Sequence, residues 1–284
     1  MGGKDIMEKT LEAYNDVFAD IVNGLLFEGR PVVTPDSLED AQPVSFYKAE
    51  GNLHEQERDV SKYWKKCRIR IALLGFENQT KYDPFMPFRV IGYDGAAYRA
   101  QIGGDNPYPV ITIVLYFGSD RRWGKNKSLY DLIDVPEELK PYVNDYRINV
   151  FDIAFLTDEE IARFHSDFGI VADFFAHRRV DPDYRPANPR DFEHIDEVLK
   201  LLSVIADDDR YVSMMTSEGG KPKNMDQYLN RVEERGITKG TLQKAKEDAL
   251  AIRKMLKITD PVLVSQIVNV EAELVERWFE EEKV

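Results

Sequence analysis

IRIALLGFENQTKYD, at residues 69–83, begins as an apolar run and ends in polar residues. A short apolar run without a helical stripe predicts a strand that is buried on both faces of a sheet. Side chains alternate along a strand, so Glu77, Gln79 and, if the strand continues, Lys81 point to the same side. A carboxylate at the end of a buried strand is costly unless it is paired, hydrogen-bonded or bound to a cation. Glu77 therefore marks a candidate site.

A second carboxylate, Asp59, precedes this strand in EQERDVSKYW. The local sequence around Asp59 fits either a strand or a short helical turn. An Asp and a Glu brought together from neighbouring strands would suit a hard divalent cation such as Mg²⁺.

The next elements follow a turn after Gln79. Pro84 and Pro87 predict the start of a helix, because Pro is tolerated in the first helical turn. We expect this helix to pack closely on the sheet through Phe88, Ile91, Gly92, Gly95 and Tyr98, and to end at Gly103, Gly104 and Pro107. The run 110–117 is strongly β-prone. With an amphipathic helix predicted over residues 5–27, the order becomes α–β–β–α–β.

The combination of Asp59, the ENQ of residues 77–79 and the MPFR of residues 86–89 resembles the PD-(D/E)XK nuclease superfamily. With Tyr93 and the VITIVLYFG strand, the chain is most similar to the family of recombination-promoting nucleases and putative transposases. The resemblance implies an α/β (α+β) fold, with a restriction-endonuclease-like mixed sheet flanked by helices in residues 1–180. Residues 181–284 would form an α-helical C-terminal extension that ends in a helix-turn-helix-like pair.

The same resemblance implies a Mg²⁺-dependent (or Mn²⁺-dependent) DNA endonuclease that hydrolyses phosphodiester bonds, in recombination or in the movement of mobile elements. Asp59 and Glu77 would hold the metal. Gln79 stands where many superfamily members have Lys, and it would orient water through its amide. Lys81 is a candidate for the missing charge, or else a surface lysine in a turn.

The N-terminal helix offers two further carboxylates. NDVF at residues 15–18 matches an acidic element on this helix of the family. Asp16 or Asp20 would then help to hold the metal; otherwise both lie on the solvated face of the helix.

The net charge of −13 argues against a protein that coats nucleic acid non-specifically. Two local groups of cations nevertheless flank the predicted site in sequence, and Arg89 can pair with a carboxylate or contact phosphate. The groups are Arg58, Lys62, Lys65, Lys66, Arg68 and Arg70, and Arg121, Arg122, Lys125 and Lys127. We expect Arg89, Lys81, Arg121, Arg122 and Lys125 to contact DNA.

The remaining segments are assigned from the residues that break or cap helices and from their hydrophobic periodicity. Residues 28–58 read as irregular, and LTDEEIARFHSDFGIVADFFAHRR reads as one helix opened by a capping box. Another helix is predicted over residues 191–206. The tail from Met225 is nearly all helical, and we expect it to support a homo-oligomer.

Bulk features favour a cytoplasmic protein that does not insert into membranes. No segment has the apolar length needed to span a bilayer, and the first residues lack the apolar core of a signal peptide. Cys67 is the single cysteine, which excludes a disulfide framework. Two other functions stay open: a nuclease fold that binds nucleic acid without cutting it, and an interaction protein that forms oligomers through its helical tail.

Overall fold

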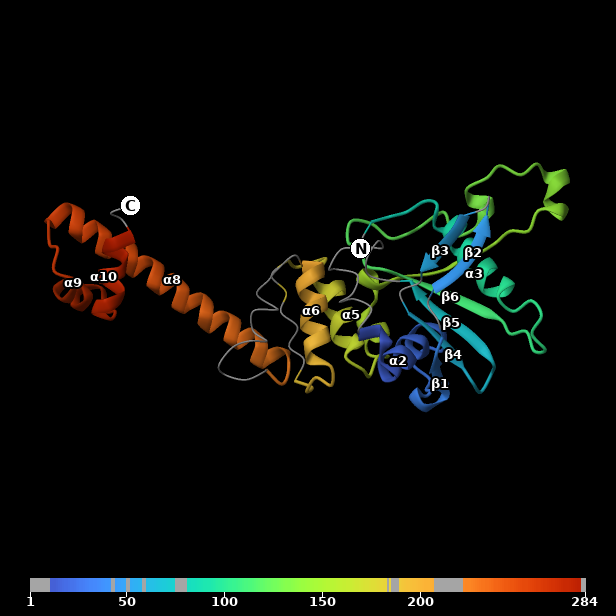
Figure 1. Ribbon diagram of the computed structural model, residues 1–284, viewed down its shortest axis with the longest axis horizontal. Coiled ribbons are helices and arrows are strands. Elements are labelled where there is room, and N and C mark those ends of the chain that lie inside the picture. The colour runs from blue at the N-terminus through green and yellow to red at the C-terminus, as the bar shows by residue number, and fades with distance from the viewer. Residues whose placement is uncertain are drawn as a thin grey trace. The chain divides into compact units, whose positions relative to one another are not determined.

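The computed structural model describes residues 11–41, 44–49, 52–57, 60–74, 81–182, 184, 189–206 and 222–281. The chain divides into two compact units, residues 1–225 and 226–284 (Figure 1). The helix α6 (Ile195–Ala206) packs with α5 (Phe168–Arg178) inside the first unit. The boundary at residue 180 between a nuclease-like domain and a helical C-terminal extension stays a prediction.

A mixed five-stranded sheet forms the centre of the first unit (Figure 1). Its spatial order is β1-β4-β5-β6-β7, in which β1, β4 and β5 are antiparallel neighbours, and β5, β6 and β7 are parallel neighbours. The strands are β1 (Leu38–Asp40), β4 (Val60–Trp64), β5 (Ile69–Leu74), β6 (Val110–Tyr116) and β7 (Asn149–Asp152). A separate hairpin pairs β2 (Val44–Ala49) with β3 (Asn52–Glu57).

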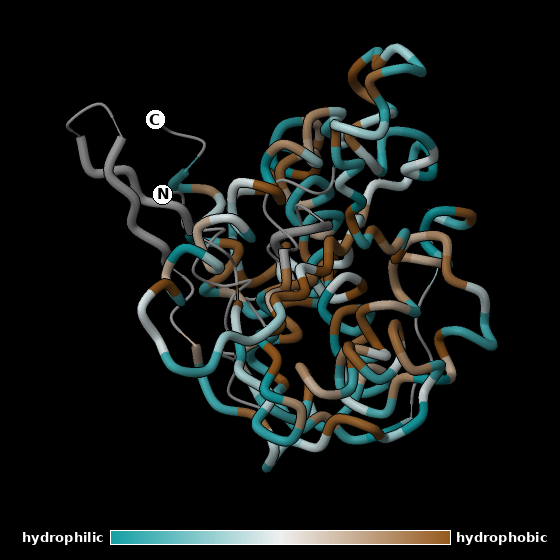
Figure 2. The backbone as a smooth tube through the Cα atoms, turned by 90° about the vertical axis from the view of Figure 1, so that its right-hand side faces the viewer, coloured by the Kyte–Doolittle hydropathy of each residue, from teal (hydrophilic) through white to brown (hydrophobic). Residues whose placement is uncertain are grey.

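The two central strands carry the apolar core. Residues 71–73 of β5 are at most 1% exposed, and residues 113–115 of β6 are fully buried. Such continuous burial is expected where a sheet is covered on both faces. In Figure 2 the hydrophobic segments lie mainly toward the middle of the view, and hydrophilic segments follow many of the outer loops. The prediction of a buried strand beginning at residue 69 is confirmed.

Helices and short 3₁₀ turns connect these strands. The helices are α2 (Asn15–Leu26), α3 (Met86–Arg99), α4 (Asp158–Ile161), α5 and α6, and the 3₁₀ turns are η1 (Pro35–Ser37), η2 (Leu129–Asp131), η3 (Glu137–Tyr142) and η4 (Ile153–Phe155). The helix α3 links β5 to its parallel neighbour β6, as parallel strands require. The series α2–β4–β5–α3–β6 therefore reproduces the predicted order of elements.

The helix α2 packs against the sheet along the direction of β4. The Phe18 ring lies 5.8 Å from the Lys62 ammonium, and the Phe27 ring lies 6.3 Å from the Trp64 ring. Both pairs advance in the same chain direction, so the N-terminal end of α2 lies toward the start of β4. Asn23 fixes the chain after the helix, because its buried side chain bonds the backbone of Val32 and Val33.

The second unit is a small helical cluster. It contains the greater part of α8 (Met225–Leu256), together with α9 (Pro261–Val268) and α10 (Ala272–Glu281). Asp260 caps α9, because its side chain accepts a hydrogen bond from the backbone N–H of Val262 at 2.9 Å. The core of the cluster consists of Ala245, Ala249, Val264, Val275, Trp278 and Phe279. Oligomer formation through these helices stays a prediction.

Four sequence-based expectations differ from the structure. A bend at Tyr14 interrupts the helix predicted over residues 5–27, and α2 begins after it. Residues 28–58 were expected to be irregular, but they contain β1 and the β2–β3 hairpin. The sequence did not indicate these strands because their pairing depends on partners that are distant in sequence or on weak local patterns. The helix predicted after residue 156 is split into α4 and α5 by the loop 162–167. The helix α3 ends at Arg99, before the two glycines that were expected to end it.

The buried face of α3 also differs from the expected one. Phe88 is 43% exposed and Tyr98 is 47% exposed, whereas Met86, Val90 and Ala97 are buried. The small and medium-sized residues of α3 allow close packing, so its aromatic residues remain on the outside. No helix in the described part of the chain is both long enough and apolar enough to cross a membrane.

Two glycine substitutions test the packing of α2 and α3. A Cβ atom at Gly24 of α2 would lie 2.2 Å from the Phe164 ring, whereas a Cβ atom at Gly95 of α3 would meet no atom within 4 Å. We expect Gly24→Ala to lower the free energy of unfolding by about 1–3 kcal/mol through overpacking. Gly95→Ala should raise it by about 0.5–1 kcal/mol through helix propensity. Urea unfolding measures both changes, and equal effects would contradict the described helix packing.

Candidate functional site

The start of β4 and the ends of β5 and β6 lie at one edge of the sheet. Val60 pairs with Leu73 in the antiparallel ladder, and Leu74 pairs with Val114 in the parallel ladder. The predicted catalytic residues Asp59, Glu77 and Gln79 lie outside the described residues. In sequence, Asp59 directly precedes β4, and Glu77 and Gln79 follow β5.

A basic loop, residues 118–127, follows β6 at this edge. Buried Trp123 anchors it, because its backbone N–H donates to the Asp152 carboxylate at 2.6 Å and its ring packs against Tyr82 and Tyr116. The Arg121 guanidinium lies 4.0 Å from the centre of the Tyr82 ring. The loop therefore has an apolar anchor and exposes three cations, Arg121, Arg122 and Lys125.

Lys81 and Arg89 lie on the segment that leads into α3. Lys81 is exposed in a bend before the helix. The Arg89 guanidinium forms an ion pair with Asp83 at 3.2 Å. Burial lowers the pKa of Arg89, but its hydrogen bonds with Tyr93 and Asp83 outweigh this effect and leave the pKa raised. Arg89 thus stabilises the start of α3, and a contact with DNA stays a prediction.

The described members of the first group of cations do not form an exposed cluster at this edge. Lys62 is 1% exposed and is paired with Asp40 of β1, and buried Arg70 donates to Ser61 at 2.8 Å. Exposed Lys65 and Lys66 occupy the β4–β5 turn, roughly 13 Å along the strand from Val60. Arg58 lies outside the described residues. Two of these cations are therefore structural.

Asp20 holds the loop 162–167 against α2. Its carboxylate accepts hydrogen bonds from the backbone N–H groups of His165 and Ser166 and from the Ser166 hydroxyl, at 2.7–2.9 Å. The residue is 9% exposed, so it does not lie on a solvated helix face. Metal binding by Asp20, which stays a prediction, would compete with these contacts.

Asp167 connects the same loop to the segment 190–194. Its side chain is 1% exposed and accepts from the backbone N–H groups of Glu193 at 3.0 Å and His194 at 2.6 Å. Arg190 completes the connection by donating to the backbone carbonyls of His165 and Ser166. Asp20 and Asp167 thus fix the segment 190–194 beside α2.

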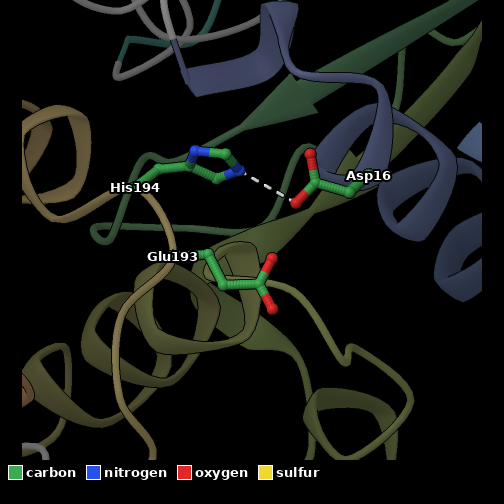
Figure 3. A group of neighbouring side chains, drawn as sticks. All are labelled: Asp16, Glu193 and His194. Carbon is green, nitrogen blue, oxygen red and sulfur yellow. Dashed lines mark hydrogen bonds and ion pairs between the residues drawn. The ribbon is translucent and has the colours of Figure 1, made fainter.

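Asp16, Glu193 and His194 come together at this junction (Figure 3). Their donor atoms all lie within 4.8 Å of one another. His194 Nε2 lies 2.9 Å from Asp16 Oδ2, and the His194 ring stacks on Tyr14 with the ring centres 3.7 Å apart. In the described part of the chain, this is the group of three side chains with ligand atoms close enough to share a metal ion.

An open pocket of about 270 Å³ adjoins the junction. It is lined by Asp16, Ala19, Asp20, Asn23, Pro31, Val33, Thr34, Pro35, His165, Ser166 and Glu193. Sequence reasoning identified Asp16 and Asp20 but missed Glu193, His194 and Asp167. The motif SDF at residues 166–168 and the dipeptide at 193–194 gave weak local signals. Asp167 is 26 and 27 residues from Glu193 and His194, and the partners on α2 are more than 100 residues away.

The fold and strand order define a mixed-sheet α+β protein with flanking helices and a helical C-terminal region. Residues 70–183 match the model of a family described as "Putative transposase, YhgA-like". The resemblance predicted from the sequence is thereby confirmed for this segment, which runs from β5 to the residues after α5. Neither the curated proteins nor the solved structures include a match to the chain.

The role of Asp20 can be tested by removing its carboxylate. We expect Asp20→Ala to lower the free energy of unfolding by roughly 3 kcal/mol, because hydrogen bonds to a buried charge are lost and loop N–H groups lose their acceptor. Amide hydrogen exchange at His165 and Ser166 should become faster. Asp105→Ala is the matched control at an exposed position, with an expected change within about 0.5 kcal/mol. A loss below about 1 kcal/mol for Asp20→Ala would show that other contacts hold the loop.

Proposed function

We propose that the protein is a metal-dependent DNA endonuclease that hydrolyses phosphodiester bonds in recombination or in the movement of mobile elements. The match of residues 70–183 to a putative transposase family carries this proposal. The match supports a function related to transposition. Metal-dependent hydrolysis of DNA is the more specific part of the proposal.

The described sheet edge supports this chemistry. Asp59 directly precedes Val60 in the sequence, and Glu77 and Gln79 follow Leu74. Leu74 is the residue after Leu73, which pairs with Val60. The exposed cations of the basic loop follow the neighbouring end of β6. Carboxylates can hold a metal ion, and neighbouring cations can contact phosphate groups. Together they suit a phosphodiester substrate.

In the proposed mechanism, Asp59 and Glu77 hold one or two Mg²⁺ (or Mn²⁺) ions. When bound, such an ion would supply neutralisation of phosphate charge and activation of water for hydrolysis. The Gln79 amide would orient that water. Because Gln79 is neutral, Lys81 is the candidate residue that would supply a positive charge at this site.

Substrate binding is assigned to the exposed cations Arg121, Arg122, Lys125 and Lys81, together with Arg89. A net charge of −13 disfavours general binding to polyanions, so DNA would have to be bound locally. The anchored Trp123 gives these cations a fixed base, which reduces the entropy lost on binding.

Plasmid nicking with Mg²⁺ or Mn²⁺ tests the catalytic proposal. We expect wild-type protein to nick supercoiled DNA, and we expect Asp59→Ala and Glu77→Ala each to reduce the rate at least 100-fold, because each removes a carboxylate that holds the ion. Added chelator should abolish nicking.

The other outcomes of this experiment are distinct. Full activity in both variants would overturn the assignment of these carboxylates. Salt-sensitive DNA binding without cleavage under either ion would indicate a binding module. Absence of both activities together with a concentration-dependent mass would indicate an oligomeric interaction protein.

A pair of double variants tests the basic loop. We expect Arg121→Gln with Lys125→Gln to weaken DNA binding and to reduce the slope of log affinity against log salt by about 1 for each lost phosphate contact. Lys65→Gln with Lys66→Gln removes two cations from the β4–β5 turn, at the other end of the hairpin. This control should retain the wild-type slope, and an equal loss in both would contradict a local binding surface.

A further inference from the structure

The junction between α2 and the segment 190–194 brings together the ligand types of a transition metal. Asp16 and Glu193 each supply a carboxylate oxygen, and His194 supplies an imidazole nitrogen (Figure 3). Imidazole nitrogen is a preferred ligand of Zn²⁺ and related ions, whereas Mg²⁺ prefers oxygen alone. The donor set therefore differs in kind from the carboxylate pair assigned to Mg²⁺ above.

The surrounding structure holds these donors in place. The Asp167 carboxylate accepts the backbone N–H groups of both Glu193 and His194, so the two neighbouring ligands share one buried anchor. Tyr14 stacks on the His194 ring and restricts its rotation. Asp16 is presented from the first turn of α2, on an element that packs on the sheet. Support of this kind, behind the ligands, is typical of sites that bind a metal tightly.

Local charge also favours a cation. The Tyr14 hydroxyl donates a hydrogen bond to Glu197 at 3.3 Å. Glu197 therefore adds a carboxylate beside those of Asp16 and Glu193.

We propose that Asp16, Glu193 and His194 form a binding site for a divalent transition-metal ion, with Zn²⁺ as the best fit. Tetrahedral ligands about 2.1 Å from Zn²⁺ stand roughly 3.4 Å apart. The donor atoms already lie within 4.8 Å of one another, and the exposed Glu193 side chain can close the difference by rotation. Three protein ligands leave a fourth position for water or another ligand.

Glu193 and His194 take no part in the proposed nuclease chemistry, whereas Asp16 was also predicted from the sequence to help hold the nuclease metal. A metal ion bound there would join α2 to the segment that leads into α6, two parts of the chain separated by more than 170 residues. It adds a direct bond between elements that Asp20 and Asp167 already connect through loops.

Calorimetric titration with ZnCl₂ tests the site in the full chain carrying Asp59→Asn and Glu77→Gln, which remove the carboxylates of the proposed nuclease site. We expect this parent to bind about one Zn²⁺ per chain. Adding His194→Ala should weaken binding at least 10-fold, since loss of a direct ligand should cost no less than loss of a supporting residue. Glu193→Gln keeps the side-chain shape at an exposed position and should also weaken binding, even if His194→Ala disturbs folding.

His177→Ala provides the matched control. His177 also lies beside two carboxylates, Asp158 at 3.2 Å and Asp173 at 3.0 Å, so it reports on ordinary His–carboxylate pairing. This variant should bind Zn²⁺ as tightly as the parent. Parent-like affinity in both His194→Ala and Glu193→Gln, or no Zn²⁺ binding by the parent, would overturn the site and leave His194 as a simple ion-pair partner of Asp16. Either result is independent of whether wild-type protein nicks DNA.

Discussion

The parallel pairing of β5 with β6 is the constraint on which the rest of the first unit depends. Antiparallel β4 lies on the other side of β5, so the pairing places the start of one strand beside the ends of two others. The segment that contains α3 must then connect the end of β5 to the start of β6, and the basic loop must begin where β6 ends. Burial of β5 and β6 on both faces keeps these two strands at the centre of the sheet.

Two buried carboxylates organise the side of the molecule where α2 lies. Asp20 and Asp167 both accept backbone N–H groups from loops that have no regular secondary structure of their own. Buried N–H groups need an acceptor, and a carboxylate supplies several lone pairs at one point. Acidic residues that seem available for catalysis can therefore be committed to shaping a loop. Asp16, one helical turn before Asp20, is the carboxylate that remains directed toward His194.

The sequence predicted the elements whose signals are local. The apolar run at residues 69–74, the Pro-initiated helix at Met86 and the β-prone run at Val110 all occur as expected, because periodicity and burial act over neighbouring residues. It missed β1, which is three residues long and is specified by its pairing with β4 rather than by its own composition. It likewise missed His194, whose significance depends on Asp16, 178 positions away. Lys62 and Arg70 looked like a basic surface because sequence alone does not reveal which cations are buried beside a partner.

The mixed sheet has a consequence for how this chain could be divided into fragments. The segment that matches the transposase family begins at residue 70, inside β5, and so excludes β4 and β1. A fragment cut at that boundary would turn a fully buried central strand into an exposed edge with a free row of backbone donors and acceptors. Flat apolar edges of this kind recruit other strands and promote aggregation. The smallest soluble piece should therefore start no later than α2, whose Phe18 covers Lys62 of β4.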